Sequence, residues 1–264
     1  MGSFLRLAVL GLFISLVFGC SKKSEKSESK INENQIIEGP ENIAYKIVSF
    51  EKKHLDQPPL LTITVSYPEF VSANSQKTRD NINQKIASHF GASDINEIET
   101  KIDKYIGLYK RFRRKKGIDS LSKHTSNFYE RVLYLSPNAL SLSFESNGLN
   151  SERQFERLRL FLLDPKTGKS QTLDNFLKPG YDEKLTNLGE SIFRKKQGLT
   201  TDENLFKAGF LFEGNRFYLS DNSALTEDGI LFYYNPGKIT DNMVEGYELK
   251  IPLDSLQTLI QKKW

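Results

Sequence analysis

Apolar and polar residues alternate along several short segments of the chain, and a period of two predicts half-buried β-strands. In the segment 139–145, Ser141 and Ser143 alternate with apolar residues, so we expect one face of that strand to be exposed to solvent. The alternation and the β-branched and aromatic content predict strands at 44–51, 60–67, 128–135, 139–145, 157–163, 229–235 and 245–251, a return strand at 170–173 and a short hairpin at 210–219.

The strand predicted at 229–235 is apolar on both faces, because Leu231 and Tyr233 alternate with residues that are also apolar. A strand of this kind is expected in the middle of a sheet rather than at its edge. The tract before it, 220–229, is rich in Asp, Asn, Ser and Gly and predicts a turn. The strand at 245–251 alternates cleanly and is predicted to be half-buried.

A period near 3.6 residues predicts helices elsewhere. Ile82 and Ile86 lie four residues apart in the first helix, and isoleucines and aromatic residues hold one face of the second. The helices are predicted at 75–90, from Ser93 to about 116, at 181–197 and, as a closing helix, after Pro252.

These elements predict an α+β fold, with a mostly antiparallel sheet and helices packed on one side. We expect two tandem α/β subdomains, an N-terminal one at 42–150 and a C-terminal one at 151–264. The length of 264 residues and the hydrophobic content of 38% suffice for one large or two small globular domains.

The N-terminus carries a twelve-residue apolar run, Leu7–Phe18, after Arg6. Twelve residues are too few to span a bilayer, which takes roughly 20. The run and its flanks predict a lipoprotein signal peptide at 1–19, with Cys20 as the lipidated residue. The alternative is an unprocessed signal peptide with an incidental cysteine. Residues 20–41 are polar and predict a flexible, lipid-anchored linker.

Export and a lipid anchor predict a location in the cell envelope, on the outer membrane or a periplasm-facing membrane surface. Cys20 is the only cysteine of the chain, so a monomer has no internal disulfide. Nucleic acid is not an expected partner of an exported protein.

Charge is distributed unevenly along the chain. Residues 110–116 contain six cations in seven positions, which suits an anionic partner or, alternatively, a helix end that complements the macrodipole. Residues 221–254 contain seven acids against two lysines, which suits a cationic partner or simple loop solvation. The pattern leaves both alternatives open for both segments.

No constellation of residues predicts catalysis. The chain has three histidines, His54, His89 and His124, and we expect each in an ordinary surface position. No nucleophile elbow or phosphate-binding glycine motif is present. We therefore expect no catalytic residue, metal site or cofactor. A pair of carboxylates for glycoside hydrolysis stays open, because its separation is a three-dimensional property.

The segment 217–256 carries the succession DGILFYYNPGKI, a spacer and a polar strand ending in Ile251-Pro252 before LDSL. In this order it resembles the C-terminal domain of unknown function 3298, found in RsiV-type anti-sigma proteins and PdaC-type deacetylases. The resemblance continues back to about Leu173, and further upstream a D-x-x-T-G turn at Asp164–Gly168 also matches the family. The N-terminal part, with Asn81-Ile82-Asn83 in its first helix, resembles the partner domain of unknown function 4163.

RsiV-type relatives bind lysozyme, a cationic protein, so the resemblance implies a protein partner of that kind. The leading hypothesis is a non-enzymatic, lipid-anchored envelope protein that binds a protein, with lysozyme as a candidate, or a cell-wall glycan. The alternative is an envelope hydrolase or accessory module in peptidoglycan or polysaccharide processing, and a third is a purely structural lipoprotein. Anti-sigma function is not expected, because no cytoplasmic domain precedes the hydrophobic segment.

Overall fold

The structure is a computed structural model, and it describes residues 35–54, 60–115, 123–150, 153–241 and 245–264. Contacts divide the chain into residues 1–31 and 32–264, and every described residue belongs to the second unit. The predicted signal peptide, Cys20 and most of the predicted linker lie outside the described residues.

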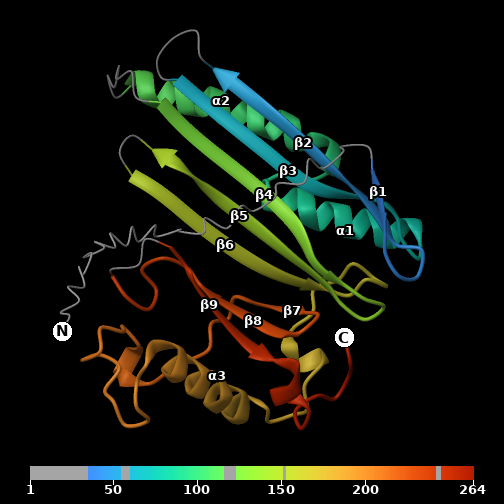
Figure 1. Ribbon diagram of the computed structural model, residues 1–264. Helices are drawn as coiled ribbons and strands as arrows, with labels where there is room; N and C mark the ends of the chain where they lie inside the picture. The colour runs from blue at the N-terminus through green and yellow to red at the C-terminus, as the bar shows by residue number, and fades with distance from the viewer. Residues whose placement is uncertain (1–34, 55–59, 116–122, 151–152, 242–244) are drawn as a thin grey trace, which may run out of the picture. The chain divides into compact units, whose positions relative to one another are not determined.

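Six strands form one sheet in the order β1-β2-β3-β4-β5-β6 (Figure 1). Neighbouring strands are antiparallel, except for the parallel pair β3 and β4. A parallel pair needs a long crossover, and the helices α1 and α2 lie in it. The strands are β1 (Ile36–Glu38), β2 (Ala44–His54), β3 (Leu60–Ser72), β4 (Lys123–Leu135), β5 (Leu140–Asn150) and β6 (Arg153–Leu163).

The helices α1 (Gln76–His89) and α2 (Ile98–Lys115) contribute to the core of this sheet. The side chain of Ser75 accepts a hydrogen bond from Thr78 N and caps α1, which satisfies one of the free N–H groups of the first turn. Ile82 and Ile86 of α1 are fully buried, as the helical spacing predicted. A 3-10 turn, η1 (Ile95–Glu97), leads into α2.

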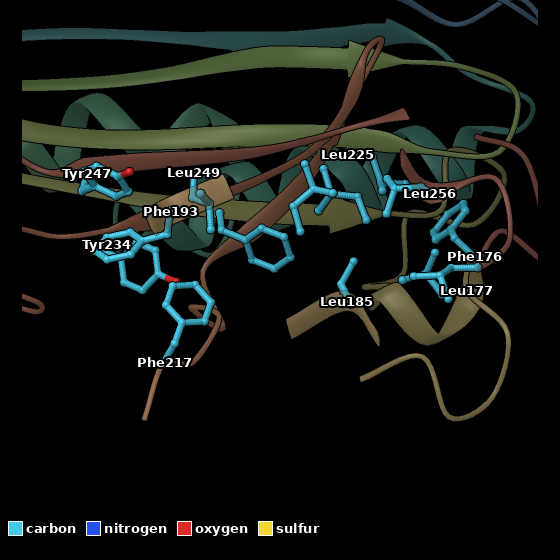
Figure 2. Close-up of a cluster of buried hydrophobic side chains, with 14 of the residues drawn as sticks. Phe176, Leu177, Leu185, Phe193, Phe217, Leu225, Tyr234, Tyr247, Leu249 and Leu256 are labelled. Atoms are coloured by element: carbon cyan, nitrogen blue, oxygen red, sulfur yellow. The ribbon is translucent and has the colours of Figure 1, made fainter. Parts of the chain in front are cut away.

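A second, three-stranded antiparallel sheet has the order β7-β8-β9, with β7 at Ser223–Thr226, β8 at Gly229–Tyr234 and β9 at Tyr247–Pro252. The helix α3 (Asp182–Gln197) packs against β9. Figure 2 shows the core between them, in which Phe193 of α3 contacts a ring of aromatic side chains. At the end of the chain, Trp264 donates from Nε1 to Thr226 O at 2.9 Å and lies edge-on to Phe176.

The structure confirms the α+β class, and the larger sheet is mixed. The strand β8 is central in its sheet, as its two apolar faces predicted. On β9, the alternation of buried and exposed residues is also as predicted. The predicted boundary between subdomains, at 150 and 151, falls between β5 and β6, which pair along their whole length in one sheet.

Several local predictions are wrong. No strand forms at 210–219; a 3-10 turn, η3 (Glu213–Asn215), lies there, and Phe212 and Phe217 enter the aromatic core. The closing helix is only one 3-10 turn, η4 (Leu253–Leu256). At 170–173 the return strand is reduced to a single bridge between Leu163 and Ser170, and 3-10 turn η2 (Leu173–Asn175) begins there. The turn predicted at 220–229 contains β7.

Two predictions about exposure also need correction. The segment 36–38, assigned to the flexible linker, pairs with β2 as strand β1 because its backbone completes the edge of the sheet. Ser141 and Ser143 are buried, because β7 lies against β5 on that face. Within the described ranges, no helix is long and apolar enough to cross a membrane.

Candidate functional site

The free edge of β6 is where the two sheets meet, and asparagine side chains make the connection. Asn235, directly after β8, accepts from Leu158 N at 2.8 Å and donates to Leu158 O at 3.0 Å. Asn222, directly before β7, accepts from Leu160 N at 2.7 Å and donates to Leu158 O at 2.9 Å. The two amides thus bond to the edge of β6 as the backbone of a neighbouring strand would.

Apolar and aromatic contacts support this junction. Leu160, Ala224 and Tyr233 form a small buried cluster between the sheets. The hydroxyl of Tyr233 donates to Glu156 Oε1 at 2.7 Å. Burial raises the pKa of Tyr233, and the hydrogen bond to Glu156 raises it further, so the phenol is the donor over the whole physiological range.

A cleft of about 450 Å³ opens beside the junction. One wall is the edge of β6 from Leu160 to Leu162, together with the adjoining segment 170–173. The other lining residues belong to the first turns of α3, from Tyr181 to Thr186, to the segment 219–223 that leads into β7, and to β8, which contributes Phe232. Segments far apart in the sequence therefore line the cleft together.

The only charged side chains that line this cleft are the carboxylates of Asp182 and Asp221. Asp182 lies in the first turn of α3, where a negative charge also complements the helix macrodipole. Burial, followed by the hydrogen bond that its hydroxyl donates to Asp174, raises the pKa of Tyr181 to about 12. The lining is therefore partly apolar and carries negative charge.

A second hollow of about 540 Å³ lies on the other side of Asp221 and has the opposite charge. Arg157 and Arg159 of β6 and Lys238 line it, against Glu156 and Asp221. Asp221, Leu160 and Phe161 thus line both hollows, and the second one also contains cationic side chains.

The structure disperses the acidic set predicted at 221–254. All seven carboxylate residues are exposed, yet Asp221 alone among them lines the cleft. Asp228 pairs with Lys250 at 2.9 Å, and the hydrogen bonds from Lys250 and Thr226 lower the pKa of Asp228. Of the acids that the sequence placed together, only Asp221 therefore contributes to the cleft.

Residues 110–115 of the predicted basic set form the end of α2, where Arg111 is exposed and Lys110 is half-buried. The side chains of residues 113–116 lie outside what the structure describes. The choice between an anionic partner and a solvated helix end stays a prediction.

The expectation of surface histidines is wrong for two of the three. His54 ends β2, whereas His124 is buried in β4 and the side chain of His89 is only 7% exposed. His89 Nδ1 lies 2.9 Å from Oε1 of Glu130 on β4, and the imidazole stacks on Phe161 of β6. The sequence hid this pair, because His89 and Glu130 are 41 residues apart.

Burial, followed by the positive charges of Lys85 and Arg159, lowers the pKa of His89 to about 4. Burial also raises the pKa of Glu130 well above its usual value, while the charge of Lys85 acts in the opposite direction. The imidazole is thus neutral at neutral pH, burial favours the protonated form of Glu130, and the two side chains share one hydrogen bond. His89 Nε2 and Glu130 Oε2 have no partner among the described residues.

Metal binding has no support in the described part of the chain, where no group of three or more His, Cys, Asp or Glu side chains is placed to hold an ion. The predicted lipidation residue, Cys20, lies outside the described residues, so its role stays a prediction.

Comparison with known families matches the segment that contains both carboxylates of the cleft. Residues 174–254 match the family model described as a protein of unknown function (DUF3298). The match includes Asp182 and Asp221, whereas the β6 wall lies outside it. No curated protein matches the chain.

Two crystal structures share the fold. A member of the DUF3298 family from Bacteroides fragilis is 18% identical, with a TM-score of 0.65 over 83% of this chain and 94% of that chain. A DUF3298 family protein from Pseudomonas aeruginosa is 14% identical, with a TM-score of 0.57 over 84% of this chain and 95% of that chain. These alignments extend well beyond residues 174–254.

The resemblance to domain 3298 is thereby confirmed for the C-terminal segment, and the resemblance to domain 4163 stays a prediction. Sequence reasoning missed Asn222, Asn235 and Gln171, all three at the junction or the cleft. The first two lie in tracts rich in turn-forming residues, which also explains why they were interpreted only as turns.

Proposed function

We propose that the protein is a non-enzymatic, lipid-anchored binding protein of the cell envelope, and that it recognises a cationic protein at the cleft between β6 and α3. The observation that carries the proposal is the pair of carboxylates, Asp182 and Asp221, as the only charged side chains of a partly apolar cleft.

The chemistry of the cleft suits a lysine or arginine side chain. An aliphatic stem packs on apolar walls such as Leu173 and Leu185, while the cationic head pairs with carboxylate. Charge complementarity of this kind contributes to specificity and speeds association more than it adds affinity. Lysozyme is a cationic protein and the natural first probe.

The alternative of an envelope hydrolase or accessory module has less support. Neither histidine nor cysteine lines the cleft. The described His–Glu pair is buried under Phe161, on β4 and α1, with a largely inaccessible imidazole.

The binding test compares the mature protein with an Asp182→Asn, Asp221→Asn double variant. We expect the wild type to bind lysozyme at low salt, and the double variant to bind more weakly by up to about 30-fold, since each exposed charge pair contributes up to about 1 kcal/mol. Isothermal titration calorimetry at two salt concentrations measures both effects, because screening weakens the interaction at high salt.

The matched control is Asp228→Asn, Asp254→Asn, which removes the same charge from exposed positions outside the cleft. Equal losses in the two double variants would contradict a role of the cleft. Retention on purified peptidoglycan without lysozyme binding would favour a glycan ligand, and no binding to either would overturn the proposal.

Lipid anchoring has its own test. Cys20→Ser is expected to move the protein from the detergent phase to the aqueous phase in a phase-partitioning experiment, because acyl chains supply the membrane affinity. Unchanged partitioning would contradict the anchor without affecting the binding proposal.

A further inference from the structure

At the free edge of β6, the structure shows which of the outward N–H and C=O groups between Leu158 and Leu162 have a hydrogen-bonding partner. The pairing of β5 with β6 has no register shift, so every second residue of β6 directs both its N–H and its C=O away from β5. The outward bonds of Leu158 to Asn235 and Asn222 show which residues these are. Leu160 and Leu162 follow at steps of two.

Between Leu158 and Leu162, four of the six outward groups are occupied. Leu158 uses both of its groups, Leu160 N donates to Asn222, and Leu162 O accepts from Gln171 N at 2.8 Å. The carbonyl of Leu160 and the N–H of Leu162 have no partner among the described residues. They flank Phe161, and the stretch Leu160–Leu162 is the part of β6 that lines the cleft.

The C=O of Leu160 and the N–H of Leu162, free within the described part of the chain, lie on either side of Phe161. At the edge of a sheet, two such groups can form hydrogen bonds with the N–H and C=O of one residue of an added chain. Asn222 blocks the edge on one side and the backbone of Gln171 blocks it on the other. The opening therefore accepts a single residue at a chain end or a turn, rather than a full strand.

The side chain of Gln171 supplies a second observation at the same place. Its Oε1 is buried and has no hydrogen-bond donor among the described residues, although the residue lines the cleft. A buried acceptor without a donor is costly, and an incoming N–H group that reached it would remove that cost.

We propose that the cleft captures one lysine or arginine residue of a partner protein by its main chain. The residue's N–H donates to Leu160 O, its C=O accepts from Leu162 N, and its cationic side chain pairs with Asp182 or Asp221. The cationic character of the ligand rests on the proposed function, whereas the main-chain pairing rests on the edge of β6.

The test uses three single-residue peptides on the mature protein: acetyl-Lys-methylamide, the same peptide with an N-methyl group on the main-chain nitrogen of the lysine, and the ester analogue in which oxygen replaces that N–H. The parent peptide is expected to shift the ¹⁵N–¹H resonance of Leu162 and to slow its hydrogen exchange. Loss of one main-chain hydrogen bond is expected to weaken binding by about 3- to 10-fold for the ester, and steric exclusion to weaken the N-methyl peptide further.

Each outcome decides between the two proposals. Equal binding of the three peptides, together with weaker binding by the Asp182→Asn, Asp221→Asn variant, would overturn main-chain capture and leave a charge-only cleft. No shift of the Leu162 resonance at about 10 mM parent peptide would also overturn it. Lysozyme binding is measured separately, so failure of the inference and failure of the proposed function are distinguishable.

Discussion

The six-stranded sheet is joined to the rest of the described fold in two chemically different ways. On the helix face, Ile82, Ile86 and Ile98 are fully buried against the sheet without polar contacts of their own. At the β6 edge, Asn222 and Asn235 hold the backbone of one strand through four hydrogen bonds.

The two kinds of contact differ in how strongly they depend on direction. Apolar packing is roughly proportional to buried area and prefers no single register. Side-chain amides, by contrast, bond to particular backbone groups and therefore fix the position of the small sheet along β6. The cleft lies beside this polar junction, where Leu160, Phe161 and Leu162 of β6 form part of its lining. On the helix face, where packing is continuous, neither α1 nor α2 contributes to the lining, whereas Phe161 of β6, which stacks on His89 of α1, does.

The largest effect is expected where packing is apolar. Ile86→Ala should lower the free energy of unfolding by about 2 to 5 kcal/mol, because a fully buried side chain leaves a cavity. Urea denaturation followed by circular dichroism measures it, and Leu108→Ala, at a 59% exposed helix position, is the matched control. Similar small losses in both variants would contradict the packing that the structure shows.

The polar junction should respond less to a single change. Asn222→Ala removes two hydrogen bonds and leaves Leu160 N without its acceptor, so we expect a loss of about 1 to 3 kcal/mol. The same denaturation experiment measures it, with Asn187→Ala on the exposed side of α3 as control. A loss no greater than in the control would show that the amides do not hold the edge.

The buried pair behind Phe161 predicts a pH dependence that appears only when one partner is removed. The folded pair holds one proton, on Glu130, because the pKa of His89 is lowered to about 4 and that of Glu130 is raised. Between the ordinary values of 4.5 and 6.5, the unfolded chain also holds one, on the histidine. Folding then neither takes up nor releases a proton at the pair, so the pair adds no pH dependence to the stability in that range.

Glu130→Gln leaves His89 alone, whose contribution is present above pH 6.5 and is lost as pH falls toward 4. His89→Gln leaves Glu130 alone, whose contribution is present below pH 4.5 and is lost as pH rises. We expect slopes of opposite sign, each up to about 1.4 kcal/mol per pH unit, in unfolding free energies measured from pH 4.5 to 6.5. The same slope of unfolding free energy against pH in both variants would contradict this prediction. Lys85 and Arg159 are unchanged in both variants, so they cancel in the comparison.

Much of the fold could be predicted from local pattern. The helices α1 and α3 and the strands β3, β8 and β9 show their period directly in the sequence, because each buries one face or both. The parallel pairing of β3 with β4 could not be predicted, since nothing in either strand specifies a partner more than 50 residues away.

Failures occurred where side chains serve a distant element. Phe212 and Phe217 alternate like strand residues, yet they fill the core around Phe193 from an irregular segment. For the candidate site, sequence reasoning supplied Asp221 within an acidic stretch but not Asp182 or the β6 edge. A cleft whose walls lie in separate segments leaves no spacing that a sequence pattern can show.

The tie between Trp264 and Thr226 O has a practical consequence. The chain contains one tryptophan, so its indole emission, excited at wavelengths that tyrosine does not absorb, reports on the surroundings of Trp264 beside the small sheet, whereas circular dichroism averages over both sheets. If the two signals change together during denaturation, the sheets unfold as one cooperative unit. If the indole emission changes first, the C-terminal sheet separates while the larger one stays folded, and a single optical titration of the unlabelled protein distinguishes these cases.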